Sequence, residues 1–187
     1  MVSNSFAQAL AISGEISTAV KEINTEEAEK LAERIMQARS VFVAGGGRSG
    51  LMMKAFAMRL MQMGYQAYVV GETVTPAIGP EDLLLIGSGS GETQSLCAMA
   101  NKAKSLDASL ALITIQPGST IGKLADAVLK LPGATKDQAG VTGTTRQPMA
   151  SLFEQTLLVV LDGMILKLMS MQELSSENMF VQHANLE

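Results

Sequence analysis

The sequence predicts an α/β fold: a five-stranded parallel sheet in a doubly wound arrangement, with helices on both faces and a helical extension before the first strand. Three observations predict this fold. Short aliphatic segments alternate with helical patterns across residues 40–131. Two of these segments run into loops of glycine and serine, each followed by a helical pattern. The chain has 187 residues, 47% of them hydrophobic, which suffices for one domain with a full core.

The amino-terminal region predicts two helices. The pattern is helical over residues 4–37 and breaks near Asn24. Thr25 is expected to cap the second helix, whose first turn is acidic. The apolar positions of that helix recur at helical spacing, so we expect this extension to pack against the domain or against a neighbouring chain.

The central region predicts alternating strands and helices. Strands are expected near residues 41–44, 66–70, 83–87, 109–114 and 127–131, and helices near residues 49–63, 93–105 and 119–124. Several of the 13 methionines gather on the first of these helices, where adaptable core packing is the first explanation. A methionine-rich surface for a partner or an oligomer seam is the alternative.

The third strand leads into the loop that organises the rest of the prediction. Gly87 follows four aliphatic residues, and a helical pattern begins after the loop Ser88, Gly89, Ser90, Gly91, Glu92 and Thr93. Glycine lets backbone N–H groups crowd one point, and the amino-terminus of a helix adds positive potential. The loop therefore predicts an anion site, with phosphate as the expected anion. A tight connection between strand and helix is the alternative.

The first strand ends in a similar loop. Gly45, Gly46 and Gly47 precede Arg48 and Ser49, and Ser49 is expected to cap the following helix. Arg48 is expected either to offset the charge of a phosphate or to be an exposed arginine at the loop tip.

A flavodoxin-like strand order, 2-1-3-4-5, would bring these two loops together. In that order the first and third strands are neighbours at the point where the strand order reverses, and ligands of doubly wound sheets bind beyond the carboxyl ends of the strands at that point. The chemistry of the two loops and the topology therefore predict the same crevice.

The carboxyl-terminal third predicts a loop and a long helix. Residues 133–147 form either a lid or a plain connector, and Pro148 is expected in the first turn of the helix that follows. That helix is apolar on nearly every face, which favours burial on more than one side and a homo-oligomer, a dimer or a tetramer. The charged residues Glu154, Asp162 and Lys167 argue for a helix buried in protein rather than in a membrane.

Two residues near this helix are candidates for proton transfer. Glu154 shares an apolar stripe with Leu157 and Leu161, where a carboxylate needs either a partner or a catalytic purpose. A favourable interaction with the start of the helix is the equally good alternative. His183, the one histidine, lies in a terminal segment whose apolar residues predict that it is docked; a surface histidine is the alternative.

Composition narrows the remaining function classes. A net charge of −4 and 4% aromatic residues give no basis for binding nucleic acid. Cys97 is the one cysteine and is expected to be a small core residue without a disulfide, and no cluster of histidine and cysteine predicts a metal. Residues 1–10 show no secretory signal, so we expect a cytoplasmic protein.

These motifs together carry a family resemblance. The loops at Gly45–Ser49 and Ser88–Thr93, with Pro117–Ser119 and Leu124–Asp126, resemble the sugar isomerase (SIS) domain. Gly133–Lys136, Gln147–Met149, Ser151–Glu154 and His183–Glu187 resemble more specifically the 6-phospho-3-hexuloisomerases of that family. The resemblance covers the whole chain and implies a single SIS domain over residues 1–187, with helices in 1–38, the α/β core in 40–131 and helices and a tail in 148–187.

The resemblance implies an activity and assigns residues to it. The activity is interconversion of D-arabino-hex-3-ulose 6-phosphate and fructose 6-phosphate through a cis-enediolate, in formaldehyde fixation by the ribulose monophosphate route, coupled to 3-hexulose-6-phosphate synthase. Ser49 and the segment 88–93 would hold the phosphosugar, and Glu154 would accept the proton. His183 would move a proton or stabilise the enediolate, either in its own chain or in a neighbouring one. One carboxylate base suffices for this chemistry without a cofactor or metal.

Two other interpretations stay open. The chain could be an isomerase of the same fold acting on another phosphosugar, such as a pentose or heptose phosphate. It could also be a non-catalytic module that binds a sugar phosphate. A buried glutamate argues against the second of these, because a phosphate receptor gains nothing from a buried base.

Overall fold

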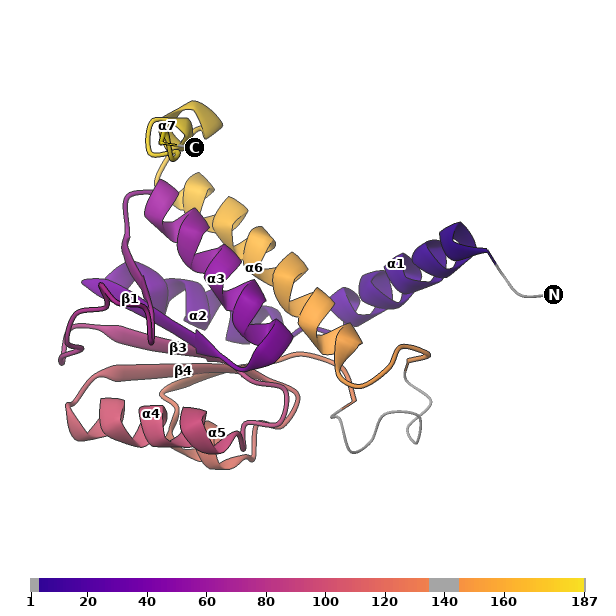
Figure 1. Cartoon of the computed structure of the whole chain (residues 1–187), viewed down its shortest axis with the longest axis horizontal. Helices are drawn as coiled ribbons and strands as arrows, with labels where there is room; N and C mark the ends of the chain where they lie inside the picture. Colours follow the sequence, from indigo (N-terminus) through magenta and orange to yellow (C-terminus); the bar gives the residue numbers. More distant parts are fainter. Residues whose placement is uncertain (1–3, 135–144, 187) are drawn as a thin grey trace.

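A computed structural model describes residues 4–134 and 145–186 and confirms the predicted α/β fold (Figure 1). Its five strands are all parallel, in the predicted order β2-β1-β3-β4-β5. The strands are β1 (Ser40–Gly45), β2 (Gln66–Val69), β3 (Leu83–Gly87), β4 (Ser109–Thr114) and β5 (Ala127–Lys130). Each lies within one or two residues of the segment expected from the sequence.

The central strands are buried because their side chains are aliphatic on both faces. Every residue of β3 is buried, as parallel strands covered by helices on two sides require. β1 and β3 pair so that Gly45 lies opposite Gly87. The two strands therefore end at the same level of the sheet, and the two glycine loops leave it side by side.

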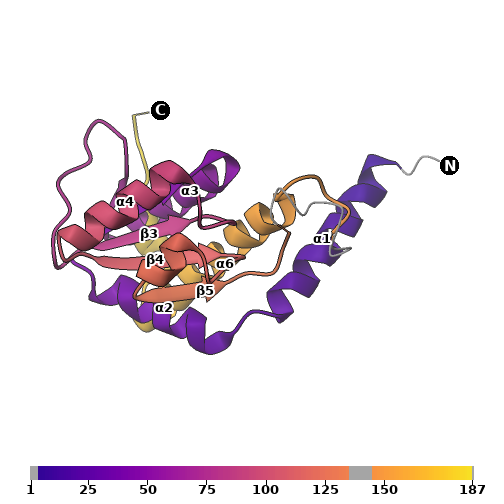
Figure 2. The same ribbon diagram turned by 90° about the horizontal axis from the view of Figure 1, so that it is seen from below.

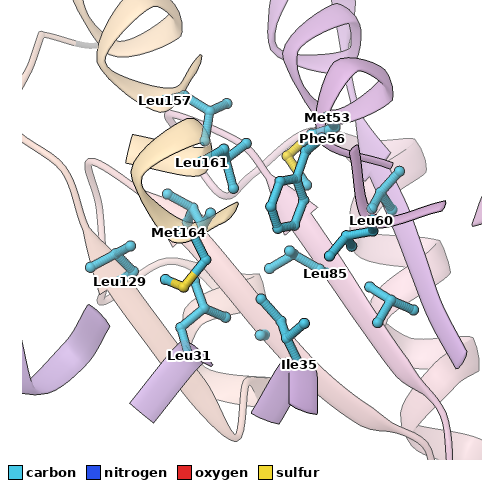
Figure 3. Close-up of a cluster of buried hydrophobic side chains, with 14 of the residues drawn as sticks. Leu31, Ile35, Met53, Phe56, Leu60, Leu85, Leu129, Leu157, Leu161 and Met164 are labelled. Carbon is cyan, nitrogen blue, oxygen red and sulfur yellow. The ribbon is translucent and has the colours of Figure 1, made fainter. Parts of the chain in front are cut away.

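Two helical layers cover the sheet. α2 (Thr25–Gln37), α3 (Gly47–Gln62) and α6 (Ser151–Met171) lie on one face, and α4 (Gln94–Ser105) and α5 (Thr120–Leu124) on the other (Figures 1 and 2). On the first face the three helices enclose a core of leucine, isoleucine, methionine and phenylalanine, with Phe56 and Leu161 fully buried above Leu85 (Figure 3). α3 and α6 therefore pack side by side on the sheet, and this packing fixes the position of the first turn of each.

The two terminal helices extend beyond this body. α1 (Ser5–Lys21) contacts α6 and then projects away from the sheet in both views (Figures 1 and 2). It buries only Ala19 among its residues and exposes Phe6 and Leu10. α7 (Ser176–Phe180) lies beside the carboxyl-terminal end of α6. No helix in the described ranges is both long enough and apolar enough to cross a membrane.

Three predictions about helix starts are wrong. Asn24, rather than Thr25, caps α2, because its side-chain oxygen accepts the N–H groups of both Glu26 and Glu27. Ser49 does not cap α3, because the helix begins two residues earlier, at Gly47, and the carbonyl oxygen of Gly46 already accepts the N–H of Gly50 at 3.3 Å. Pro148 lies outside α6, because Met149 with a φ of 57° interrupts the helical path before Ser151.

The loop after β5 is described only at its ends. Residues 135–144 lie outside the described residues, so the choice between a lid and a connector stays a prediction. The end of this loop is attached to α1. The carboxylate of Glu15 accepts hydrogen bonds from the Thr145 hydroxyl at 2.6 Å, the Arg146 N–H at 3.1 Å and the Gln147 amide at 3.0 Å.

Candidate active site

A cavity of about 410 Å³ lies beyond the carboxyl ends of β1 and β3, where the strand order reverses. Both glycine loops and the start of α6 line it. Most of the predicted site residues meet there, together with three that were not predicted: the lining residues are Gly46, Gly47, Arg48, Ser49, Gly87, Ser88, Gly89, Ser90, Thr93, Ala150 and Glu154.

The first loop needs glycine for a close approach. A Cβ atom on Gly45 would lie 2.9 Å from the backbone nitrogen of Gly50, and one on Gly50 would lie 2.5 Å from the carbonyl oxygen of Gly45. The strand therefore turns into α3 within a space that no side chain could share. This turn brings Arg48 and Ser49, in the first turn of α3, to the cavity.

The second loop uses its serines to hold its own shape. The Ser88 hydroxyl oxygen accepts the N–H of Gly91 at 3.2 Å, and the Ser90 hydroxyl oxygen accepts the N–H of Glu92 at 3.3 Å. Each serine acts as an acceptor within the loop, which leaves its O–H proton free to donate to a ligand. Both serines line the cavity.

The helices that reach the cavity differ from the others in their caps. α1, α2, α5 and α7 each have a side chain that accepts an N–H of the first turn. α3, α4 and α6, the three helices whose first residues or N-caps line the cavity, have no such side chain in the part of the chain that the structure describes. The positive ends of these three helix dipoles lie at one cavity, and no described side chain occupies their first-turn N–H groups, which makes the cavity a site for an anion.

Glu154 contributes the carboxylate of the cavity. It lies in the first turn of α6 and is 7% exposed, with Leu157 and Leu161 further along the same stripe. The Arg48 Nε atom lies 2.9 Å from Glu154 Oε2, which makes an ion pair. The N–H bond is not aligned with this oxygen, so Oε2 is buried without a hydrogen bond from any described residue. The cavity thus joins an anion site to a carboxylate with a free lone pair.

Comparison with known proteins agrees with this geometry. Residues 34–161 match the family model of the SIS domain. The chain belongs to the SIS domain family. It is 53% identical over 176 residues to the 3-hexulose-6-phosphate isomerase of Bacillus subtilis, covering 94% of this chain and 95% of that one. It is 42% identical over 173 residues to the 3-hexulose-6-phosphate isomerase of Mycobacterium gastri, covering 92% and 86%.

A solved structure extends the agreement to three dimensions. This SIS domain superposes on the crystal structure of a Methanococcus jannaschii protein with a TM-score of 0.81 and 33% sequence identity. The superposition covers 97% of this chain and 99% of that one. From its structure, that protein was inferred to be a 3-hexulose-6-phosphate isomerase. The loops and helices around the cavity therefore belong to a fold that the two proteins share over almost the whole chain.

Two residues of the second SIS loop turn away from the cavity. Gly91 has a φ of 63°, and a Cβ there would lie 2.0 Å from the Ser119 hydroxyl, so glycine is needed where the loop passes α5. Glu92 Oε1 accepts the N–H of Thr120 at 2.7 Å, at the start of α5. This backbone hydrogen bond lowers the pKa of the Glu92 carboxyl. Both residues thus hold the loop to α5. The sequence had instead predicted that they contact the substrate.

His183 lies far from Glu154 in its own chain. It follows α7, is exposed, and stacks on Phe180 with ring centroids 5.9 Å apart. It borders a different cavity of about 410 Å³, together with Arg59 and Asp162, near the end of α6 that is remote from Glu154 (Figure 1). One chain therefore does not bring the two predicted catalytic residues together.

Sequence reasoning missed Ala150 and the role of Glu15. Ala150 lines the cavity as the uncapped start of α6, and the sequence contains no signal for it, because Ser151, one residue later, is the more usual type of N-cap residue. Glu15 holds residues 145–147, which lead into α6. Burial opposes its ionisation, but the hydrogen bonds from Thr145, Gln147 and Arg146 lower the pKa of Glu15 overall. No local pattern in α1 signals this contact across 130 residues.

Proposed function

We propose that this chain is a phosphosugar isomerase that interconverts D-arabino-hex-3-ulose 6-phosphate and fructose 6-phosphate. The observation that carries the proposal is Glu154: a buried carboxylate whose Oε2 receives no hydrogen bond from the described residues, beside a cavity lined by the starts of three helices without side-chain caps. The names of the relatives at 53% and 42% identity support the choice of substrate.

The phosphate would bind where the helix amino-termini meet. The N–H groups at the starts of α3, α4 and α6 would donate to its oxygens, together with the hydroxyls of Ser49, Ser88, Ser90 and Thr93. Because these donors are fixed by the loops, binding would require little reorganisation. The phosphate would thereby hold the sugar carbons over Glu154.

Glu154 would carry the proton between two neighbouring carbons. In the direction of fructose 6-phosphate it removes the proton from C2, and the C2–H electron pair forms the C2=C3 bond of an enediolate while the C3 carbonyl becomes an oxygen anion. A proton moves from the C2 oxygen to the C3 oxygen, and Glu154 returns its proton to C3 as the C2 carbonyl forms. Atoms and charge balance without an external oxidant, since carbon-bound hydrogen only moves within the substrate.

His183 would enter this reaction from a neighbouring chain. The end of the molecule that carries it exposes several large apolar side chains, namely Met58, Met61, Leu166, Phe180 and Val181. Burial of such a surface in a homo-oligomer, a dimer or a tetramer, would stabilise the assembly. In a symmetric assembly the tail of one chain would reach the cavity of another, where His183 would move the proton between the two sugar oxygens.

The reaction would follow the step that builds the hexulose phosphate. We expect this step to be supplied by 3-hexulose-6-phosphate synthase from ribulose 5-phosphate and formaldehyde, with both enzymes in the cytoplasm. An SIS isomerase for a pentose or heptose phosphate is the second candidate. The names of the closely similar relatives argue against it, and Glu154 argues against a module that only binds a sugar phosphate.

A coupled assay tests the proposal. Purified chain is added to 3-hexulose-6-phosphate synthase, ribulose 5-phosphate and formaldehyde, and fructose 6-phosphate is measured through a dehydrogenase couple. We expect fructose 6-phosphate to form with the wild type and with Glu33→Gln, an exposed control on α2, but not with Glu154→Gln. If the wild type forms no fructose 6-phosphate while it isomerises a pentose or heptose phosphate, the second candidate replaces the first.

A further inference from the structure

The cavity contains two charged side chains of opposite sign among the residues that line it in the described part of the chain, Arg48 and Glu154. Arg48 belongs to the first turn of α3 and Glu154 to the first turn of α6. Their Nε and Oε2 atoms lie 2.9 Å apart. The pair thus joins the first glycine loop, where the anion is expected, to the carboxylate that is expected to act as base.

This ion pair is close but not locked. Oε2 receives no aligned hydrogen bond from Arg48, so the guanidinium does not grip the carboxylate in the parallel two-bond geometry that makes such pairs strong. The Arg48 side chain is 57% exposed, whereas the Glu154 side chain is 10% exposed. The helix and its apolar neighbours fix Glu154, and the solvent gives Arg48 room to move. Arg48 is therefore the partner that can leave.

An anion in the cavity would compete for Arg48. A phosphate ester carries close to two negative charges at neutral pH and offers three oxygens, and the planar guanidinium matches two of them at once. Such an anion at the start of α3 lies beside the residue that carries the guanidinium. The competition is therefore between a fixed carboxylate with one unaligned contact and a ligand with better geometry and more charge.

We propose that the phosphate of the substrate draws Arg48 away from Glu154 and thereby frees the base. Arg48 is thus a positioning residue that pairs with Glu154 while no anion is bound and transfers to the ligand when one binds. Departure of Arg48 then clears the space beside Oε2, so that the carbon-bound proton can approach this oxygen when the sugar is present. The inference rests on the proposed function in taking Glu154 as the base, but the exchange of Arg48 between two anions can be measured without turnover.

Linkage gives the exchange a measurable consequence. If Glu154 and phosphate compete for Arg48, Glu154 weakens phosphate binding, and it does so only while Arg48 is present. Simple repulsion between the carboxylate and the anion would also weaken binding, but that repulsion does not require Arg48. A double-mutant cycle separates the two effects.

The experiment measures the affinity of the full chain for inorganic phosphate by titration calorimetry at low ionic strength. The four proteins are the wild type, Glu154→Gln, Arg48→Met and the double variant. We expect Glu154→Gln to bind phosphate about fivefold more tightly than the wild type, and Arg48→Met to bind about tenfold more weakly. In the Arg48→Met background, Glu154→Gln is expected to change the affinity less than twofold.

Matched controls remove the effect of net charge. Arg59→Met alters the charge of the same helix at its other end, where Arg59 donates to Gln62 at 2.8 Å, and Glu33→Gln removes an exposed carboxylate from α2. Both are expected to leave phosphate affinity unchanged. Equal tightening by Glu154→Gln in both backgrounds would mean repulsion alone and would overturn the proposal, as would the lack of any tightening or of any phosphate binding.

The coupled assay keeps the two proposals apart. An active isomerase whose cycle shows no coupling disproves the release of Glu154 by phosphate and leaves the function intact. A cycle with the expected coupling in a chain that forms no fructose 6-phosphate disproves the function and leaves the exchange of Arg48 intact.

Discussion

Glu154 is a carboxylate at the start of an apolar helix, and its surroundings explain why one residue can be both stable and reactive. The start of α6 favours a negative charge, and Arg48 adds a cation 2.9 Å away. Neither interaction occupies Oε2 with an aligned hydrogen bond. The structure thus offsets the cost of burying the charge without using the lone pair that proton abstraction needs.

Replacement of this carboxylate tests its role directly. Glu154→Gln keeps the shape of the side chain but cannot accept the proton, so we expect kcat to fall by about a thousandfold, within the range for loss of a general base. Substrate affinity should stay within roughly tenfold, because the amide removes an interaction made only in the transition state. Steady-state kinetics with hexulose phosphate measures the first quantity and equilibrium binding of fructose 6-phosphate the second. Turnover near that of the wild type would exclude Glu154 as the base.

The contacts of individual residues were the least predictable feature of this chain. The glycine and serine pattern predicted both loops, since local backbone geometry determines where glycine is needed. Which residues of a loop turn inward depends on neighbours that are remote in sequence. Glu92 turns to the start of α5, and Arg48 meets a carboxylate more than a hundred residues away. The caps of α2 and α3 were mispredicted by one to three residues, because several adjacent residues are compatible with a cap.

At the level of elements, helix starts fall into two groups. Those that do not line the cavity are closed by a side chain of Asn4, Asn24, Ser119 or Ser175. Those at the cavity are open. The strands and most helices were predictable because aliphatic runs and helical periodicity are local signals. The start of α6 was not, because the positive φ of Met149 has no local signature in the sequence.

The attachment of α1 to the segment before α6 gives a prediction about stability. Glu15 accepts three hydrogen bonds from residues 145–147, and these bonds lower its pKa even though burial opposes ionisation. Since the pKa is lower in the folded state, the contribution is present above the ordinary pKa of a glutamate and is lost as the pH falls through the folded value. Glu15→Gln should therefore lower the free energy of unfolding by about 1 kcal/mol at about pH 7, and by less at about pH 3.

Urea unfolding at the two pH values measures this effect. Glu22→Gln changes an exposed residue at the end of the same helix, which receives no such hydrogen bonds from residues 4–134 or 145–186. It is the control and should unfold like the wild type at both pH values. An equal loss of stability for Glu15→Gln at both pH values would contradict the role of the ionised carboxylate.

At the scale of the whole molecule, topology rather than any single motif creates the site. The order β2-β1-β3-β4-β5 places the first and third strands next to each other, and the register that pairs Gly45 with Gly87 brings their loops to one level. This arrangement was predictable because alternating strands and helices restrict the possible orders and because the two loops have the same chemistry. The separation of Glu154 from His183 within one chain was not, because the path of a terminal tail depends on packing that no local pattern encodes.

Mixed assemblies test whether His183 acts across chains. Suppose that each site takes Glu154 from one chain and His183 from another. A dimer of one Glu154→Gln chain and one His183→Ala chain then has two sites, one of which contains both residues intact. Equal mixing after reversible dissociation should restore about a quarter of the wild-type activity, although each variant alone is impaired. Coupled assays before and after mixing measure the recovery. Full activity of His183→Ala alone, or no recovery on mixing, would contradict a role in a neighbouring site.

The open starts of α3, α4 and α6 also bear on how such a protein can change over evolutionary time. Main-chain amides are the same in every sequence, so a phosphate site built from backbone N–H groups keeps its affinity through substitutions that leave the glycine turns intact. The sugar, in contrast, meets side chains, which a single nucleotide change can replace. Related proteins can therefore change their sugar specificity while they keep the same phosphate-binding site.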